Sequence, residues 1–183
     1  MSAFVVPGPV VLVGMMATGK STVGRRLAHR LGRQMFDSDA MIEASTGHTV
    51  AELWESGGEA AYRELEAGAL RQALDAEPPG VVAAAGGVVL APANRAALRQ
   101  ASTNGGVVIW LRASPQVLAA RVHAGDHRPL LAVDPAGTLQ RLDAERGALY
   151  AEVADHEIDV DGRPLDDVVG AVLRLVTGSQ VVS

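Results

Sequence analysis

The chain has 183 residues, enough for one domain with a substantial core, and 48% of them are hydrophobic, as in globular proteins. A formal net charge of −5 without any basic run argues against a nucleic-acid partner, and the absence of cysteine excludes disulfides, thiolate catalysis and cysteine-ligated zinc. The N-terminus lacks the basic region of a signal peptide, and the longest apolar run, 81–91, is too short to cross a bilayer. We therefore expect a cytoplasmic protein with no membrane partner.

Buried apolar runs alternate with helical patterns along the whole chain. Apolar runs predict strands at 9–13, 81–85 and 107–111, and we also expect short strands at 34–37 and 157–160. The helical spacings predict helices at 22–31, 40–44, 50–55, 59–76, 92–100, 115–122, 137–154 and 164–176, with breaks at Gly47 and at Gly57-Gly58. This alternation predicts an α/β fold, a three-layer αβα sandwich with a central parallel sheet of about five strands. We expect one domain over 1–183, with its core at about 9–177 and a mobile loop at about 124–134.

A phosphate-binding loop follows the first predicted strand. The segment GMMATGKS, residues 14–21, matches the G-x-x-x-x-G-K-[ST] motif between a strand and a helix. In such a loop the backbone N–H groups and the helix N-terminus hold phosphates, the lysine reaches the β- and γ-phosphates, and the hydroxyl ligates Mg²⁺. The alternative is a glycine turn that binds nothing. We predict a nucleotide site formed by Gly14, Ala17, Thr18, Gly19, Lys20, Ser21 and Thr22.

Two residues of this loop carry further expectations. Lys20 is the single lysine of a chain that has 15 arginines. Lysine is a compact charge on a thin stem and arginine is a planar fork, so a narrow loop filled by a phosphate chain favours lysine. Ala17 stands where many such loops have glycine, so we expect the backbone to avoid positive φ at this position.

Two carboxylates follow the second predicted strand, in Phe36-Asp37-Ser38-Asp39. One of them could hold Mg²⁺ through water, because this ion keeps much of its hydration shell. The other could accept a proton from an attacking hydroxyl. A purely structural role stays open, in which an Asp-rich turn caps the helix that begins near residue 40.

Three arginines and a glycine pair complete the candidate site. Arg63 lies near the start of a long predicted helix, Arg128 lies in the expected loop, and Arg146 precedes Gly147. Arginine binds a carboxylate or phosphate through two hydrogen bonds, although a single arginine is more often a solvated surface charge. Gly86-Gly87 follows a buried strand, where it would let a ligand touch the backbone or would simply form a turn.

Taken together, these segments resemble the shikimate kinases, a family of the nucleoside monophosphate kinase-like P-loop group. The matching pieces occur in the family's order and cover about residues 10–170: GMMATGKSTVGRRLA, FDSD, TVAELWESGGEAAYRELE, the AGG turn, IWLRASP, RPLL and RGALYAEVAD. Two positions depart from the family pattern. Ala85 replaces the first glycine of a GGG triplet, and Tyr62 stands where phenylalanine is more usual.

The resemblance implies a fold of the P-loop kinase type, with a lid at about 124–134 and a substrate-binding helical region at about 38–65. It implies an enzyme of aromatic amino acid biosynthesis that transfers the γ-phosphate of ATP to the 3-hydroxyl of shikimate, giving shikimate 3-phosphate and ADP. The alternatives are another small-molecule P-loop kinase, such as a gluconate kinase, or a nucleotide-binding paralogue without turnover. We expect ATP and shikimate as partners, Mg²⁺ as cofactor, and a monomer.

The resemblance also implies a role for each matching residue. The catalytic residues would be Lys20, Asp39 and Arg128, with Asp39 as the base and Arg128 closing from the lid over the transferred phosphate. Shikimate would be bound by Asp39, Arg63, Gly86, Gly87 and Arg146, and the two arginines would clamp its carboxylate. Ser21 and Asp37 would hold Mg²⁺. Arg121, Arg128 and Arg163 would all bind ATP, and of these Arg121 and Arg163 would lie near the adenine.

Overall fold

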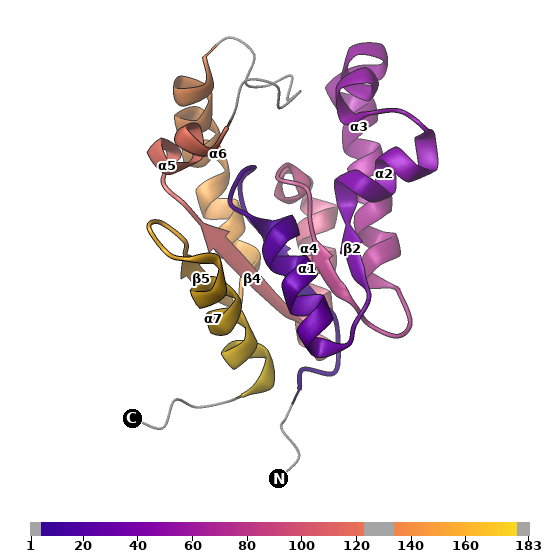
Figure 1. Ribbon diagram of the computed structural model, residues 1–183. Helices are drawn as coiled ribbons and strands as arrows, with labels where there is room; N and C mark the ends of the chain where they lie inside the picture. The colour runs from indigo at the N-terminus through magenta and orange to yellow at the C-terminus, as the bar shows by residue number, and fades with distance from the viewer. Residues whose placement is uncertain (1–4, 123–133, 179–183) are drawn as a thin grey trace.

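A parallel sheet lies between two layers of helices in the computed structural model, which describes residues 5–122 and 134–178 (Figure 1). The five strands are β1 (Val10–Val13), β2 (Met35–Asp37), β3 (Val81–Ala83), β4 (Val107–Arg112) and β5 (His156–Asp159). Their order across the sheet is β2-β3-β1-β4-β5, and in the central strand Leu12 is level with Ala83 of β3 and Ile109 of β4. The predicted α/β sandwich with five parallel strands is confirmed.

Helices cover both faces of this sheet. Within the described residues they are α1 (Lys20–Leu31), α2 (Ser38–Thr46), α3 (Val50–Leu74), α4 (Pro92–Thr103), α5 (Pro115–Arg121), α6 (Pro135–Val153) and α7 (Leu165–Thr177), with a 3₁₀ turn η1 (Val88–Leu90). Helices α1 and α7 pack together on one face, and α4 and α6 pack on the other (Figure 1). None of the helices in the described part of the chain has the length and apolar character that a membrane span requires.

Two predictions about these elements need correction. Strand β3 ends at Ala83, two residues before its predicted end, because small apolar residues give no signal for where a strand stops. The helices predicted at 50–55 and 59–76 form one element, α3, which is interrupted at Gly58 with φ +72° and ψ −179°. A residue with a side chain rarely adopts this backbone conformation, so the glycine allows the kink. The break expected at Gly57-Gly58 is thus present as a kink within α3.

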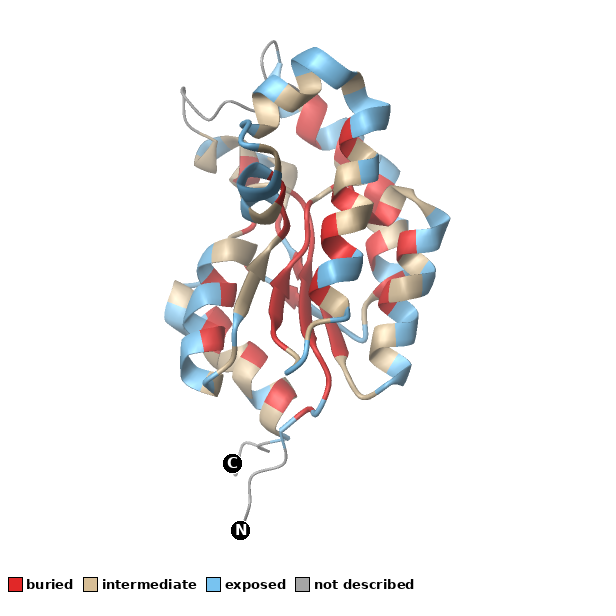
Figure 2. Ribbon diagram, turned by 90° about the vertical axis from the view of Figure 1, so that its right-hand side faces the viewer, coloured by how far each residue is buried: buried red, intermediate tan, exposed pale blue. Residues whose placement is uncertain are grey.

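The core consists of aliphatic side chains around the central strands, which are buried on both faces (Figure 2). All four residues of β1 are buried, as expected for a parallel strand covered by helices on both sides. A second, smaller apolar cluster lies between α2 and α3 and contains Ile42, Tyr62 and Ala69. The helical region expected at 38–65 therefore has a small core of its own beside the sheet.

The backbone at Ala17 contradicts the expectation that this residue avoids positive φ. Its φ is +62°, and among the described residues it is the one non-glycine residue with a positive φ. The left-handed conformation costs a residue with a Cβ roughly 1–2 kcal/mol. The path of the loop between β1 and α1 requires this dihedral, so alanine adopts a conformation that its own preference disfavours.

Replacing Ala17 by glycine is expected to raise the midpoint of thermal unfolding by about 1–3 °C. Glycine relieves about 1–2 kcal/mol of strain in the left-handed conformation, which raises the free energy of unfolding. The greater entropy of the unfolded chain lowers that free energy by less than about 1 kcal/mol. Ala96→Gly is the matched control, because Ala96 is exposed within α4 and glycine should lower the midpoint there. Equal losses at both positions would show that Ala17 carries no strain.

Candidate active site

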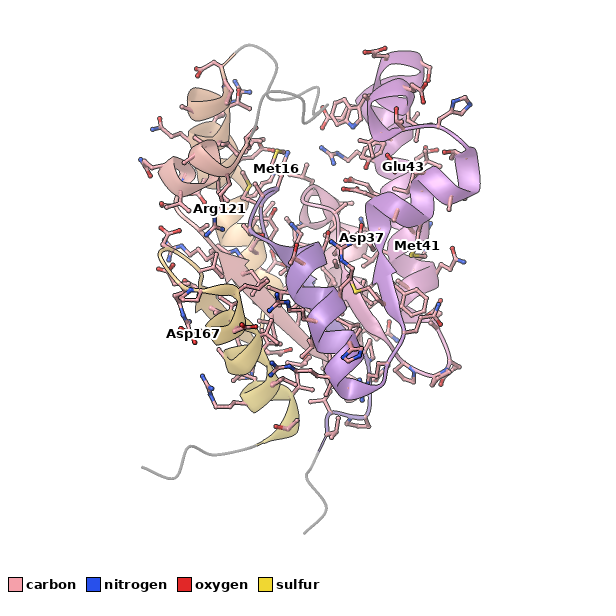
Figure 3. The ribbon with its side chains drawn as sticks, in the orientation of Figure 1. Met16, Asp37, Met41, Glu43, Arg121 and Asp167 are labelled. Atoms are coloured by element: carbon pink, nitrogen blue, oxygen red, sulfur yellow. The ribbon has the colours of Figure 1, made fainter. Side chains whose placement is uncertain are left out.

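A cavity of about 310 Å³ at the carboxyl ends of the strands brings together three segments that the sequence analysis selected. It is lined by Met16, Ala17, Gly19, Lys20, Ser21, Thr22, Asp37, Asp39, Ala83, Ala84, Ala85, Gly86 and Arg121. Figure 3 shows Asp37 and Arg121 on opposite sides of the phosphate loop. The loop, the carboxylate pair and the first part of the AGG turn thus face one space.

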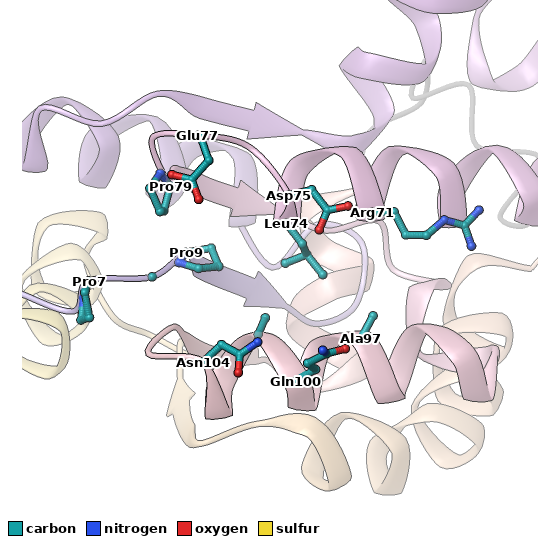
Figure 4. A pocket seen from close by; sticks show the side chains of 12 residues that line it. Pro7, Pro9, Arg71, Leu74, Asp75, Glu77, Pro79, Ala97, Gln100 and Asn104 are labelled. Atoms are coloured by element: carbon teal, nitrogen blue, oxygen red, sulfur yellow. The ribbon is translucent and has the colours of Figure 1, made fainter.

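A larger cavity, of about 640 Å³, lies at the other end of the sheet (Figure 4). Its lining includes Pro9, Pro79 and Asn104, which lie at or just before the amino ends of β1, β3 and β4. Ligands of open parallel sheets bind outside the carboxyl ends of the strands, and the phosphate loop is at that end. The smaller cavity is therefore the candidate active site.

The phosphate loop is closed by its own side chains. The Thr18 hydroxyl donates to the carbonyl oxygen of Met15 at 2.9 Å, and Lys20 Nζ donates to the carbonyl oxygens of Gly14 and Met15 at 2.8 and 2.7 Å. Gly14 has φ +140°, and a Cβ built on it would lie 2.3 Å from the carbonyl oxygen of Leu111. The lysine ammonium therefore lies across the loop, next to the space that a bound phosphate would fill.

The two aspartates use their carboxylates differently. Asp37 caps α2, because its Oδ1 accepts a hydrogen bond from the Ala40 N–H at 3.4 Å, so the structural role left open by the sequence does occur there. Asp39 Oδ1 accepts a hydrogen bond from the Tyr62 hydroxyl at 2.9 Å. Both carboxylates still line the cavity together with Ser21.

Arg63 is held firmly against the AGG turn. Its Nη1 lies 2.5 Å from Glu66 Oε2, its Nη2 lies 2.9 Å from Glu59 Oε1, and its Cζ lies 5.4 Å from the centroid of the Trp54 ring. A Cβ built on Gly87 would lie 1.7 Å from Arg63 Nη1, so a side chain at position 87 would displace the guanidinium. Arg63 is thus a fixed cation at the turn, with its side chain only 20% exposed.

Arg146 lies on α6, which packs against η1 directly after the AGG turn. The residue is 3% exposed, and its Nε has no hydrogen-bond partner within the described residues. One helical turn later, the Tyr150 hydroxyl donates to the Gly86 carbonyl oxygen at 2.5 Å, and the ring stacks on Trp110 with centroids 5.6 Å apart. A buried guanidinium N–H without an acceptor is costly, so it favours a ligand that supplies one.

The charges in this region influence one another. Burial raises the pKa of the Glu66 carboxyl above its usual value, while the guanidinium groups of Arg63 and Arg146 oppose that rise. Burial also raises the pKa of the Tyr150 hydroxyl, and Arg146 again opposes the shift. Arg63 and Arg146, which are far apart in the sequence, therefore act on the same buried groups beside Gly86 and Gly87.

The other predicted cations fall in different places. Arg121 lines the cavity and donates to the carbonyl oxygens of Ala17 and Val160 at 3.4 and 3.2 Å. Arg163 is exposed, donates to the Asp159 carbonyl oxygen at 3.3 Å, and is not among the residues that line the cavity. Arg128 and residues 124–133 of the expected lid lie outside the described residues.

Sequence reasoning missed the two buried groups that interact with the predicted arginines, Glu66 and Tyr150. Both lie on the buried face of a helix, and each is within one turn of a predicted arginine: Glu66 three residues after Arg63 and Tyr150 four after Arg146. Side chains three or four residues apart are neighbours on a helix. That spacing was the signal that could have found them.

Comparison with known proteins identifies the family. A family model described as shikimate kinase matches residues 16–177. The chain belongs to the shikimate kinase family. A shikimate kinase from Symbiobacterium thermophilum is 44% identical over 168 residues, which cover 90% of this chain and 94% of that protein. The solved shikimate kinase from Acinetobacter baumannii, in complex with shikimate, has a TM-score of 0.88 at 34% identity and covers 98% of both chains.

The shikimate kinase resemblance stated from the motifs is confirmed, and with it the class of ATP-dependent kinases. A gluconokinase from Sinorhizobium meliloti has a TM-score of 0.57 at 23% identity, which shows a common fold alone. Among the described residues no group of three or more His, Cys, Asp or Glu side chains is arranged to hold a metal ion. Ser21 and Asp37 offer two oxygen ligands in the cavity, which suits an ion that also takes phosphate and water oxygens.

Proposed function

We propose that the protein transfers the γ-phosphate of ATP to the 3-hydroxyl of shikimate, giving shikimate 3-phosphate and ADP in aromatic amino acid biosynthesis. The observation that supports this proposal is the AGG turn, which links the cavity of the phosphate loop to Arg63, while Arg63 and Arg146 both act on the buried Glu66. Gly86 lines the cavity of the phosphate loop, and Gly87 contacts Arg63. A cyclic acid fits this arrangement with its carboxylate at the arginines and a hydroxyl facing the phosphates.

The donor half of the site would bind ATP through the phosphate loop. Backbone N–H groups of Gly14 and 17–22 would surround the phosphates, and the Lys20 ammonium would move from its carbonyl partners to the β- and γ-phosphates. Ser21 and Asp37 would hold Mg²⁺, which supplies charge neutralisation at the phosphates. Arg121 and Arg163 would lie toward the adenine, and Arg128 would close over the transferred group.

The acceptor half of the site would orient shikimate. Arg63 and Arg146 would bind the carboxylate, each through charge-assisted hydrogen bonds, and the unpartnered Nε of Arg146 is a donor ready for such an oxygen. Asp39 would hold the 3-hydroxyl and take its proton as the new O–P bond forms and the bond from the γ-phosphorus to ADP breaks. Such a transfer depends mainly on alignment and charge neutralisation. The cytoplasmic location and the monomeric state stay predictions.

The test is release of ADP from ATP with and without shikimate, measured by a coupled assay, with the product identified by ³¹P NMR. We expect a rate that depends on shikimate, and a much lower rate with the uncharged methyl ester of shikimate, because the ester removes the charge that the arginines bind. A rate with gluconate instead would favour the gluconate kinase alternative. Tight ATP binding without turnover on either acid would favour a paralogue without activity.

A further inference from the structure

Tyr62 makes a contact through its hydroxyl that a phenylalanine at this position could not make. Its hydroxyl donates to Asp39 Oδ1 at 2.9 Å, while the tyrosine itself is 3% exposed. A buried hydroxyl without a partner is costly, so the pairing with a carboxylate acceptor satisfies it. Burial and the neighbouring charge of Asp39 both raise the pKa of the Tyr62 hydroxyl, so it stays a proton donor. The hydrogen bond therefore has one direction, from tyrosine to aspartate.

Asp39 has few other constraints on its orientation. It is an exposed residue in the first turn of α2, and α2 packs mainly against α3 through the small apolar cluster. The Tyr62 ring belongs to that cluster, with its centroid 5.6 Å from the Trp54 ring. The hydroxyl thus connects a buried, rigid group to a carboxylate at the edge of the cavity. Because Oδ1 is bound by Tyr62, Oδ2 is the oxygen left to meet a substrate hydroxyl.

The position of Tyr62 in the chain strengthens this reading. It directly precedes Arg63, and both follow the kink at Gly58 in α3. One turn of α3 therefore orients the carboxylate at the reacting hydroxyl through Tyr62 and supplies one cation of the proposed carboxylate clamp through Arg63.

We propose that Tyr62 is a positioning residue, whose hydroxyl holds the Asp39 carboxylate in the orientation that receives the acceptor hydroxyl. Its catalytic consequence rests on the proposed function. The Tyr62 hydroxyl would contribute to alignment of the reacting groups. If the Asp39 carboxylate had several orientations, the rate of phosphate transfer would fall more than the affinity for the acceptor.

The test is Tyr62→Phe, which keeps the ring and removes only the hydroxyl. We expect kcat for shikimate phosphorylation to fall about tenfold, the value of one hydrogen bond to a charged group. The KM for ATP should change less than about threefold, because the phosphate loop is not altered, and the KM for shikimate should change less than kcat, because the arginines that would bind its carboxylate are intact. Asp39 is exposed and can be hydrated, so the variant leaves no buried unpaired charge and should fold.

A double-variant comparison separates positioning from a structural role. In an Asp39→Ala background, Tyr62→Phe should change the residual kcat by less than about twofold, because the group it positions is absent. A tenfold fall in both backgrounds, or no fall in the single variant, would overturn the proposal. If the wild-type protein does not phosphorylate shikimate, the proposed function fails. In that case crystal structures of the wild type and of Tyr62→Phe test the positioning role by itself. The same single Asp39 rotamer in both structures would overturn the role, and several Asp39 rotamers in the variant would support it.

Discussion

Replacing Lys20 by alanine is expected to lower kcat by about 10³-fold or more. The Lys20 ammonium lies across the phosphate loop, 2.8 and 2.7 Å from the Gly14 and Met15 carbonyl oxygens, beside the place where the transferred phosphate would sit. Negative charge on that group must be neutralised as it moves, and the loss of one preorganised charged donor commonly costs 10²–10³-fold, more when it acts directly on the phosphoryl group. Steady-state rates at saturating shikimate and ATP measure the effect.

Lys20→Arg is the informative companion, because it keeps the positive charge and changes the shape. The chain uses arginine at 15 other positions, yet this one is lysine. A planar guanidinium is wider than an ammonium and should not fit between the loop and a phosphate chain. We expect Lys20→Arg to be nearly as slow as Lys20→Ala. Activity close to wild type in the arginine variant would show that charge alone is required at this position.

Neither variant should unfold the protein. The loop keeps the Thr18–Met15 hydrogen bond, and Gly14, where a side chain would clash with the Leu111 carbonyl oxygen, is unchanged. Thermal unfolding of both variants should therefore stay close to that of the wild type. A large fall in the unfolding midpoint would mean that the lysine is needed to shape the loop, and the kinetic effect would then have to be assigned to the loop as a whole.

The sequence predicted what depends on local pattern. All five predicted strands are present, three of them marked by apolar runs, and the spacing of Gly14, Gly19 and Lys20 between a strand and a helix located the loop. The dihedral of Ala17 was predicted wrongly, because residue preference was used where the shape of the whole loop decides. Local preference and loop geometry conflict at this point, which is typical of functional sites.

What the sequence could not supply was contact between elements. Arg63 and Arg146 were chosen from their surroundings in the sequence, but only the packing of α3 and α6 against η1, directly after the AGG turn, brings both into the surroundings of Glu66. The role of Tyr62 was hidden for the same reason, since its partner Asp39 is 23 residues away on α2. The departure from the family pattern drew attention to Tyr62, but the sequence did not reveal its hydrogen bond to Asp39.

Replacing Arg63 by alanine is expected to raise the KM for shikimate by about 100-fold or more and to leave the Kd for ATP nearly unchanged. The guanidinium contacts Gly87, is bound by Glu59 and Glu66, and has its side chain only 20% exposed. Removing one partner of a buried charge pair costs about 3–5 kcal/mol, and each 1.4 kcal/mol is tenfold in affinity. Shikimate would lose that partner while the phosphate loop, on another element, keeps all of its own.

The same substitution also leaves Glu66 without its ion-pair partner. The effect of this loss must be separated from the effect on substrate binding. Burial already raises the pKa of the Glu66 carboxyl and Arg63 opposes the rise, so without Arg63 the pKa rises further, which favours the neutral carboxyl. The double variant Arg63→Ala with Glu66→Gln supplies that neutral side chain directly. A shikimate KM that stays high in the double variant assigns the loss to the substrate contact, and recovery would assign it to the unpaired glutamate.

An exposed arginine provides the matched control. Arg99 lies on α4 with its side chain 48% exposed and pairs with Glu152 on α6, away from the cavity. Exposed ion pairs contribute about 0–1 kcal/mol, so Arg99→Ala should leave both constants within about twofold of the wild type. Equal losses of ATP and shikimate affinity in Arg63→Ala would contradict the clamp, because an arginine that binds only the acceptor carboxylate has no means of weakening the nucleotide.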